Sequence, residues 1–209
     1  MKIKDIIIYC NPQAQCPVLE AINQLDIVAQ IQFLHKVGNL RLSIYNESIK
    51  LDSGISALRF HYKNKEMAIY YGIGRSAIVL LYIGLKNKHE ADSKKASIYW
   101  KDYQQQRENR EYLTFAEELN KKLQDKEFAI EYLKATIVDP EERLFVLALK
   151  DVLQSQTIDD SDITEKTELN TTNLSRLLFK KNAIQVIRLP DILVALGLYL
   201  AAHPIKKIL

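Results

Sequence analysis

The sequence predicts an α+β fold in which short helices and an antiparallel sheet come first and an all-α helix-turn-helix unit follows. Residues 57–83 alternate apolar and polar side chains with a period of two and are interrupted by short turns, a pattern typical of an antiparallel meander. Between Gly84 and Pro140 there is neither glycine nor proline, and residues that favour helix predominate. This change of pattern predicts that the two halves of the chain have different architectures.

The first half is expected to hold one strand, two helices and then the meander. Residues 2–9 are predicted to form the first strand, and apolar residues at helical spacing predict short helices over 17–25 and 27–37. Gly38 is expected to end the second of these helices. The strands of the meander are expected at residues 57–62, 66–71 and 76–83, and the last is apolar nearly throughout, as a central strand should be.

The second half is expected to be helical. Two amphipathic helices are predicted, one on Tyr112, Phe115, Ala116, Leu119 and Leu123 and the next on Ala129, Tyr132, Leu133 and Thr136. A third is predicted from Asp139, whose side chain can cap the first turn, with Pro140 at the first helical position and Glu142 completing a capping box. Apolar residues cover so much of this third helix that it must be buried.

The two cysteines and the apolar runs indicate a cytoplasmic protein. No run approaches the roughly 20 apolar residues that a membrane helix needs, and no signal segment is expected. Cys10 and Cys16 are six residues apart without histidine or further cysteine nearby, which fits neither a zinc site nor a thioredoxin-type pair. We therefore expect two reduced structural thiols, no cofactor, no metal and no membrane partner.

Charge divides the chain into a basic and an acidic half. Residues 1–110 carry 16 basic and 10 acidic side chains, a net charge of +6, whereas residues 111–209 carry 13 and 16, a net charge of −3. Surface charge can drift between domains without consequence, and the alternative is that the two halves attract each other. The sequence alone leaves both accounts open.

The C-terminal segments predict a helix-turn-helix. Residues 161–169 and 170–179 have the lengths of two short helices with a tight junction, and apolar segments flank them. Asparagine and arginine can contact base edges, and serine or threonine can bind phosphates, although any solvated helix can show these residue types. The candidate DNA-binding residues are Thr171, Thr172, Asn173, Ser175 and Arg176. A homodimer through residues 189–205 on a palindromic site is expected.

Several blocks of the second half resemble the HigA-type addiction module antidotes. The strings "EYLKATIVDPEERLFVLALKDVLQS", "DITEKTELNTTNLSRLLF" and "LPDILVALGLYL" occur in the order and at the distances of that family's pattern, over roughly residues 111–200. The resemblance implies a helix-turn-helix that binds DNA, here its own operator. Glu168 stands where the family usually has a glycine at the turn, and glutamate reaches positive φ less easily than glycine.

The first half resembles the RelE/HigB-like toxins of the phage-derived killer group over residues 35–103. Arg59, Lys86 and the aromatic strand at Tyr70 match the family pattern. The resemblance implies a small αβ, RelE-like endoribonuclease that cuts messenger RNA on the ribosome, with Arg59, His61, Tyr70 and Lys86 as the candidate catalytic residues. His61 is a possible proton shuttle, the alternative being an ordinary strand residue, and Arg59 and Lys86 are phosphate contacts or plain surface charge.

The chain differs from the pattern of the toxin family at two positions. Ala68 replaces an arginine and Ala57 replaces a glutamate, so a full-strength nuclease is not expected and changing Ala68 to arginine is predicted to raise toxicity.

These resemblances predict a fused toxin–antidote protein. The predicted divisions are a toxin domain at 1–103, a linker with toxin-docking helices at 104–137 and a helix-turn-helix domain at 138–209. The favoured hypothesis is a DNA-binding autoregulator whose weakened toxin domain is neutralised in cis, with residues 111–137 covering Arg59 and Lys86 in a dry contact. The alternatives are an active nuclease silenced until release, with ribosome and messenger RNA as partners, and a transcription regulator whose αβ domain binds another ligand.

Overall fold

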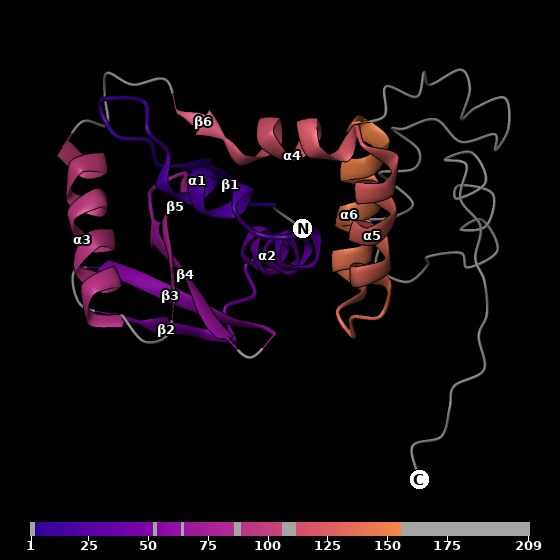
Figure 1. Cartoon of the computed structure of the whole chain (residues 1–209), viewed down its shortest axis with the longest axis horizontal. Coiled ribbons are helices and arrows are strands. Elements are labelled where there is room, and N and C mark those ends of the chain that lie inside the picture. Colours follow the sequence, from indigo (N-terminus) through magenta and orange to yellow (C-terminus); the bar gives the residue numbers. More distant parts are fainter. Residues whose placement is uncertain (1–2, 52–53, 64, 86–88, 106–111, 156–209) are drawn as a thin grey trace, which may run out of the picture.

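The computed structural model describes residues 3–51, 54–63, 65–85, 89–105 and 112–155, and within them it is a mixed α+β fold (Figure 1). Its strands are β1 (Asp5–Ile8), β2 (Ser48–Lys50), β3 (Ile55–Tyr62), β4 (Lys65–Ile73), β5 (Ala77–Leu85) and β6 (Leu113–Thr114). Its helices are α1 (Pro17–Asn23), α2 (Ile27–Arg41), α3 (His89–Gln105), α4 (Phe115–Leu123), α5 (Lys126–Ile137) and α6 (Glu142–Ser155). The α+β class predicted from the sequence is therefore confirmed for these residues.

One six-stranded sheet organises the first half, in the order β2-β3-β4-β5-β1-β6. The predicted meander is present as β3, β4 and β5, each antiparallel to the next. Strand β1 pairs in parallel with β5, because α1 and α2 carry the chain over one face of the sheet before the meander begins. A bulge leaves Leu81 unpaired between the Tyr70–Tyr82 and Tyr71–Leu80 pairs, which turns Leu81 and Tyr82 to the same side of the sheet.

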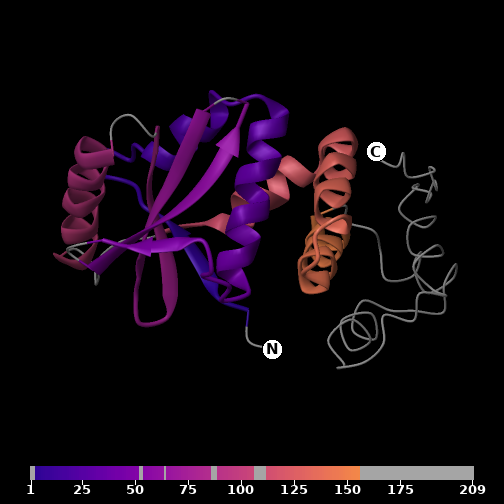
Figure 2. The same cartoon turned by 90° about the horizontal axis from the view of Figure 1, so that it is seen from below.

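The two faces of the sheet are covered by different helices. Figures 1 and 2 show α3 on one side and α2 on the other, with the α5–α6 pair beyond α2. On the α3 side, Trp100 lies so close to Gly72 that a Cβ added there would be 2.4 Å from the indole ring. The larger apolar core lies on the α2 side. We call the first side the α3 face.

Helices α4, α5 and α6 extend the core of the sheet rather than forming a core of their own. Thr114 and Glu117 make a capping box at the start of α4, and Asp125 caps α5 through the amides of Glu127 and Phe128. Most of the buried apolar residues of the three helices belong to the same cluster as α2 and the sheet, while Leu144 and Leu147 of α6 form a small cluster with Leu42. Both amphipathic helices predicted for this region are present, although Tyr112 lies before α4 and Ala116 is exposed, and α6 is buried along most of its surface, as expected.

Glycine does not end α2 where the sequence predicted. The helix continues through Gly38 to Arg41, and a Cβ at position 38 would lie 2.9 Å from a methyl carbon of Leu144. Gly38 therefore serves close packing of α6 on α2 and is not a helix terminator. From the sequence alone, a glycine that ends a helix cannot be distinguished from a glycine inside a helix that allows another helix to pack closely.

Three other expectations are corrected. The interval after α3 contains the short strand β6, which pairs with β1, although local preference favoured helix throughout. Helix α6 begins at Glu142 rather than at Pro140, although the Asp139 side chain does accept a hydrogen bond from the amide of Glu141 at 2.7 Å. Cys10 and Cys16 form a disulfide and are not reduced thiols, because the loop between them brings their Cα atoms to 4.1 Å.

The predicted helix-turn-helix and its dimer segment lie outside the described residues, as does most of the domain proposed at 138–209. Within the described part, α3 runs across the predicted boundary at residue 103, and α5 and α6 pack together on either side of the boundary at residue 137. The division into three domains stays a prediction. None of the helices in the described part has the length and apolar character needed to cross a membrane.

Candidate functional site

Arg59, His61 and Tyr70 lie together on the α3 face of the sheet. Strand β3 alternates, so Arg59 and His61 share the side of Ala57, which packs in the α3-face core with Tyr70. The register of β3 and β4 places Arg59 opposite Ala68 and His61 opposite Glu66. The structure therefore brings three of the four predicted catalytic residues to one surface, and Lys86 lies outside the described residues.

Glu66 is a member of this site that sequence reasoning missed. Its carboxylate lies 3.4 Å from Nη1 of Arg59 and 3.8 Å from Nε2 of His61. The Glu66 side chain is only 6% exposed, whereas those of Arg59 and His61 are 46% and 75% exposed. The hairpin register could have revealed this contact, because pairing Tyr62 with Lys65 places His61 across from Glu66.

The Arg59–Glu66 pair decides what the site can do with a phosphate. A nearby carboxylate neutralises the guanidinium, so a phosphate would have to compete with Glu66 for the same donors. His61 points to solvent and could exchange a proton with a bound group. The arrangement therefore holds one engaged cation and one exposed imidazole, which is a weak constellation for stabilising a developing phosphate charge.

Tyr70 is a proton donor and not a base at neutral pH. Burial, helped by the nearby carboxylate of Asp92 and opposed by Arg59, raises the pKa of Tyr70 to about 12. Its side chain is 1% exposed, which places its hydroxyl inside the protein rather than at the surface. The predicted role of Tyr70 in catalysis is therefore limited to donating a hydrogen bond from a buried position.

The raised pKa of Tyr70 predicts a loss of stability at alkaline pH. The unfolded side chain ionises near pH 10.0, whereas the folded one keeps its proton until about pH 12, so its contribution is present below pH 10.0 and falls as pH rises between these values. Denaturant unfolding of Tyr70→Phe and the parent chain should show a smaller difference, or a reversed one, at pH 11.5 than at pH 8. An identical difference at both pH values would contradict this account. Part of the alkaline loss should persist in the variant, because burial also raises the pKa of Tyr71 and Tyr132.

Ala68 is enclosed at the centre of this face. It is 0% exposed, and its cross-strand neighbours are Arg59 on β3 and Gly84 on β5. Above Gly84 lies the carboxyl group of Asp92 from α3, 2.2 Å from where a Cβ would stand. The space left by Ala68 is thus filled by α3, and the expectation that an arginine here would restore a phosphate contact loses its basis.

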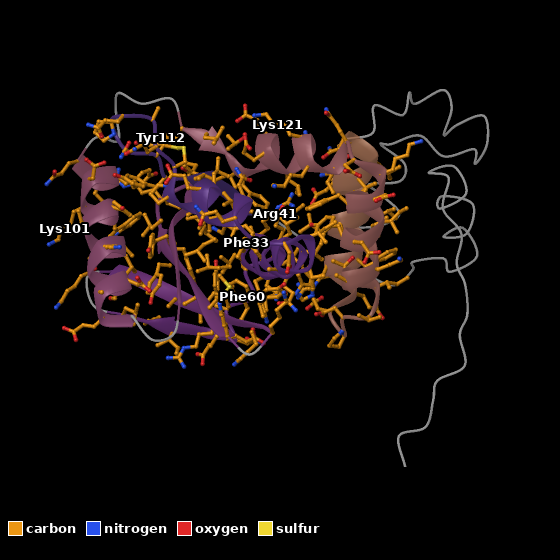
Figure 3. The ribbon with its side chains drawn as sticks, viewed as in Figure 1. Phe33, Arg41, Phe60, Lys101, Tyr112 and Lys121 are labelled. Carbon is orange, nitrogen blue, oxygen red and sulfur yellow. A yellow bond between two sulfur atoms is a disulfide. The ribbon has the colours of Figure 1, made fainter. Side chains whose placement is uncertain are left out.

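A buried ion pair lies elsewhere, between α2 and α6. Arg41 donates from Nη1 and Nη2 to the two carboxylate oxygens of Asp151 at 2.5 and 2.9 Å, and the Tyr132 hydroxyl donates to Asp151 at 3.3 Å. The side chains of Arg41 and Asp151 are 13% and 5% exposed. Burial alone would lower the pKa of Arg41, but the adjacent Asp151 carboxylate raises it above its ordinary value. Figure 3 labels Arg41 beside α2, toward the α5–α6 pair.

Buried apolar side chains of α2, α5 and α6 pack together around this bridge. Phe33 and Val37 of α2 belong to one cluster with Phe128 and Tyr132 of α5 and Phe145 of α6. Two polar contacts lie at its margin, from His35 Nε2 to Asp139 at 2.8 Å and from Lys122 Nζ to Gln30 at 2.8 Å. We call this contact of α4, α5 and α6 with α2 the cis interface.

The sequence predicted that residues 111–137 cover Arg59, but the cis interface does not cover it. Helices α4 and α5 lie against α2 and β1, on the opposite side of the sheet from the α3 face, and Arg59 is nearly half exposed. Only His61 reaches the margin, where it lines a hollow of about 480 Å³ with Ala135 and Val138. The expected position over Arg59 is wrong, because the apolar surface available for docking is that of α2, and the dryness expected of the contact stays a prediction.

The remaining site predictions lie outside the described residues. They are Lys86 in the toxin pattern and Thr171, Thr172, Asn173, Ser175 and Arg176 in the helix-turn-helix. Within the described ranges, no group of three or more His, Cys, Asp or Glu side chains is arranged to hold a metal ion.

Comparisons of the chain with protein-family models, with curated proteins and with solved structures found no match. What the chain does must therefore be argued from its sequence motifs and from the geometry described above.

Proposed function

We propose that the chain is a fused toxin–antidote protein of the RelE/HigB and HigA type that acts as a DNA-binding autoregulator. In this proposal the αβ unit built on the six-stranded sheet is the toxin-like part, helices α4, α5 and α6 hold it in cis, and the C-terminal segment binds the operator. The observation that carries the proposal is the cis interface, in which a buried arginine–carboxylate bridge joins residues 110 positions apart.

The charge and packing of the cis interface fit a neutralising segment. The basic first half contributes Arg41 and His35, and the acidic second half contributes Asp151 and Asp139 as their partners. A partner tethered in the same chain acts at a high effective concentration, so that a modest contact suffices to keep it bound. The opposite net charges of the two halves suggested that they attract each other. These two ion pairs are specific contacts through which that attraction can act.

The α3 face supports the part of the proposal that makes the toxin unit weak. Arg59 is engaged by Glu66, Tyr70 is buried, and Ala68 leaves no room for a further cation. Each missing or engaged donor removes stabilisation of the developing phosphate charge, which in enzymes is commonly worth a factor of 10² or more per donor. An attenuated nuclease whose remaining role is regulatory is the simplest account of these features.

The proposal predicts DNA binding by the full chain. A gel-shift titration with the DNA upstream of the coding sequence should show a complex that weakens as salt increases, because phosphate contacts release counterions. Asn173→Ala and Arg176→Ala should each weaken binding about tenfold, the usual effect of losing one base contact. Lys134→Ala, which removes an exposed lysine on α5, is the matched control and should leave binding unchanged. Absence of a complex at any salt, or full affinity in both variants, would remove DNA from the proposal.

The second candidate is an active nuclease silenced until release, and the exposure of Arg59 and His61 is the observation that favours it. Because the cis interface leaves both side chains open to solvent, silencing would have to act through the position of α2 and not by covering the site. Growth arrest on expression of Arg41→Ala/Asp151→Ala, abolished by adding Arg59→Ala, would favour this candidate. Normal growth with a folded double variant would favour the weakened toxin.

A further inference from the structure

A disulfide between Cys10 and Cys16 closes the loop that joins β1 to α1. The two cysteines are six positions apart, and both are partly exposed to solvent. A short ring restricts the unfolded chain less than a long one does, so the bond adds less stability than one that closes a long loop. Partly exposed disulfides that contribute little stability are the ones that small thiols reduce and re-form.

The loop is also folded by hydrogen bonds of its own. The side-chain oxygen of Asn11 accepts hydrogen bonds from the amides of Gln13 and Gln15 at 3.0 and 2.9 Å. The amide of Asn11 donates to the carbonyl of Gln15 at 2.8 Å, and the amide of Ala14 donates to the carbonyl of Asn11 at 2.9 Å. Pro12 and Pro17 further restrict the backbone on either side. These contacts keep the two sulfurs close together when the bond between them is broken.

We propose that Cys10 and Cys16 form a reversible thiol–disulfide site that exchanges with small thiols of the glutathione class, and that Asn11 is its positioning residue. This inference is independent of the proposed function. In the exchange, the thiolate of one small thiol attacks a cysteine sulfur and breaks the Sγ–Sγ bond, leaving a mixed disulfide and a cysteine thiolate. A second small thiol then attacks the mixed disulfide. The two small thiols supply two electrons and two protons, and the products are the dithiol chain and one small-molecule disulfide.

The redox state of this site should act on α1. Cys16 occupies the N-cap position of α1, and its side chain makes no capping hydrogen bond there, so the disulfide is the covalent anchor of the first turn. On the other side, Cys10 follows Tyr9, whose hydroxyl donates to Asp102 at 2.7 Å and whose ring stacks on Tyr99. Because Asn11 holds the loop and Tyr9 stays held by α3, reduction should loosen the start of α1 while leaving the loop and β1 in place.

The test uses the full chain equilibrated in buffers of reduced and oxidised glutathione at set ratios, followed by alkylation and mass measurement. We expect the disulfide fraction to follow the ratio, with the same curve from the oxidised and the reduced starting material. Asn11→Ala should lower the equilibrium constant for ring closure roughly tenfold, because two backbone amides lose their acceptor. Asn120→Ala, an exposed asparagine on α4, is the matched control and should stay within about twofold of the parent. Hydrogen exchange of α1 should be faster in the reduced chain, and that of β1 unchanged.

Three results would overturn the inference. The first is two free thiols in every buffer, even with excess oxidised glutathione. The second is a disulfide that survives excess reduced glutathione in the folded chain, which would make it a purely structural bond. The third is an Asn11→Ala variant with the ring-closure constant of the parent, which would remove the positioning role and with it the reason for reversibility.

Discussion

Replacing Asp151 with alanine is expected to destabilise the folded chain by about 3–5 kcal/mol, since it leaves the Arg41 guanidinium buried without its partner. The loss should be measured by denaturant unfolding at pH 7. It exceeds the value of an ordinary contact because the cost is that of an uncompensated charge, together with the Tyr132 hydroxyl that loses its acceptor.

Two controls separate this charge effect from general damage to the cis interface. The double variant Arg41→Met/Asp151→Leu removes both charges and should recover most of the loss, because apolar side chains of similar volume often replace a buried pair without cost. Glu131→Ala removes a partner from the exposed Lys134–Glu131 pair and should change stability by less than about 1 kcal/mol. If Asp151→Ala were as mild as Glu131→Ala, the bridge would not hold α6 to α2.

Changing Ala68 to arginine is expected to disrupt the fold and not to strengthen a nuclease. The side chain at this position is 0% exposed and has α3 above it, so a guanidinium would be buried beside Arg59 or would push α3 from the sheet. Either outcome should cost several kcal/mol and lower the yield of soluble chain. The measurement is thermal unfolding of the purified variant together with growth on its expression.

The control for this substitution is His61→Arg, which places the same side chain on the neighbouring strand at a position that is 75% exposed. It should leave the melting temperature close to that of the parent. A soluble Ala68→Arg chain with an unchanged melting temperature and strong toxicity would show that the face has room for a second cation. The attenuated-toxin account would then be wrong.

Local patterns of residue types in the sequence predicted much of the fold. The period-two alternation of β3 and β4 and the helical spacing of apolar residues in α4 and α5 are local signals, and the structure places the corresponding elements within a few residues of their predicted positions. The predictions that Gly38 ends α2 and that the β6 region is helical were wrong, because both conformations depend on residues distant in the sequence. Leu144 packs against the glycine, and β1 supplies the pairing edge for β6.

The candidate site shows the same limit. Arg59, His61 and Tyr70 were selected by type and pattern, and their common side of the sheet follows from alternation along each strand. The sequence could not indicate that Tyr70 is buried under α3, or that Arg41 and Asp151, 110 positions apart, form the bridge of the cis interface. Such contacts depend on how helices pack on the two faces of the sheet, and no local signal encodes that choice.

Hydrogen exchange of the intact chain tests the central claim most directly, which is that α4, α5 and α6 are held in cis on the αβ unit. We expect the amides of these three helices to exchange as slowly as those of α2 and the central strands, because they share one core. We also expect Asp151→Ala to speed exchange in α6 and α5 before it affects β4 and β5. If α4, α5 and α6 exchanged in the parent chain as fast as free peptides while the sheet stayed protected, the cis interface would not exist in solution and the account would be contradicted.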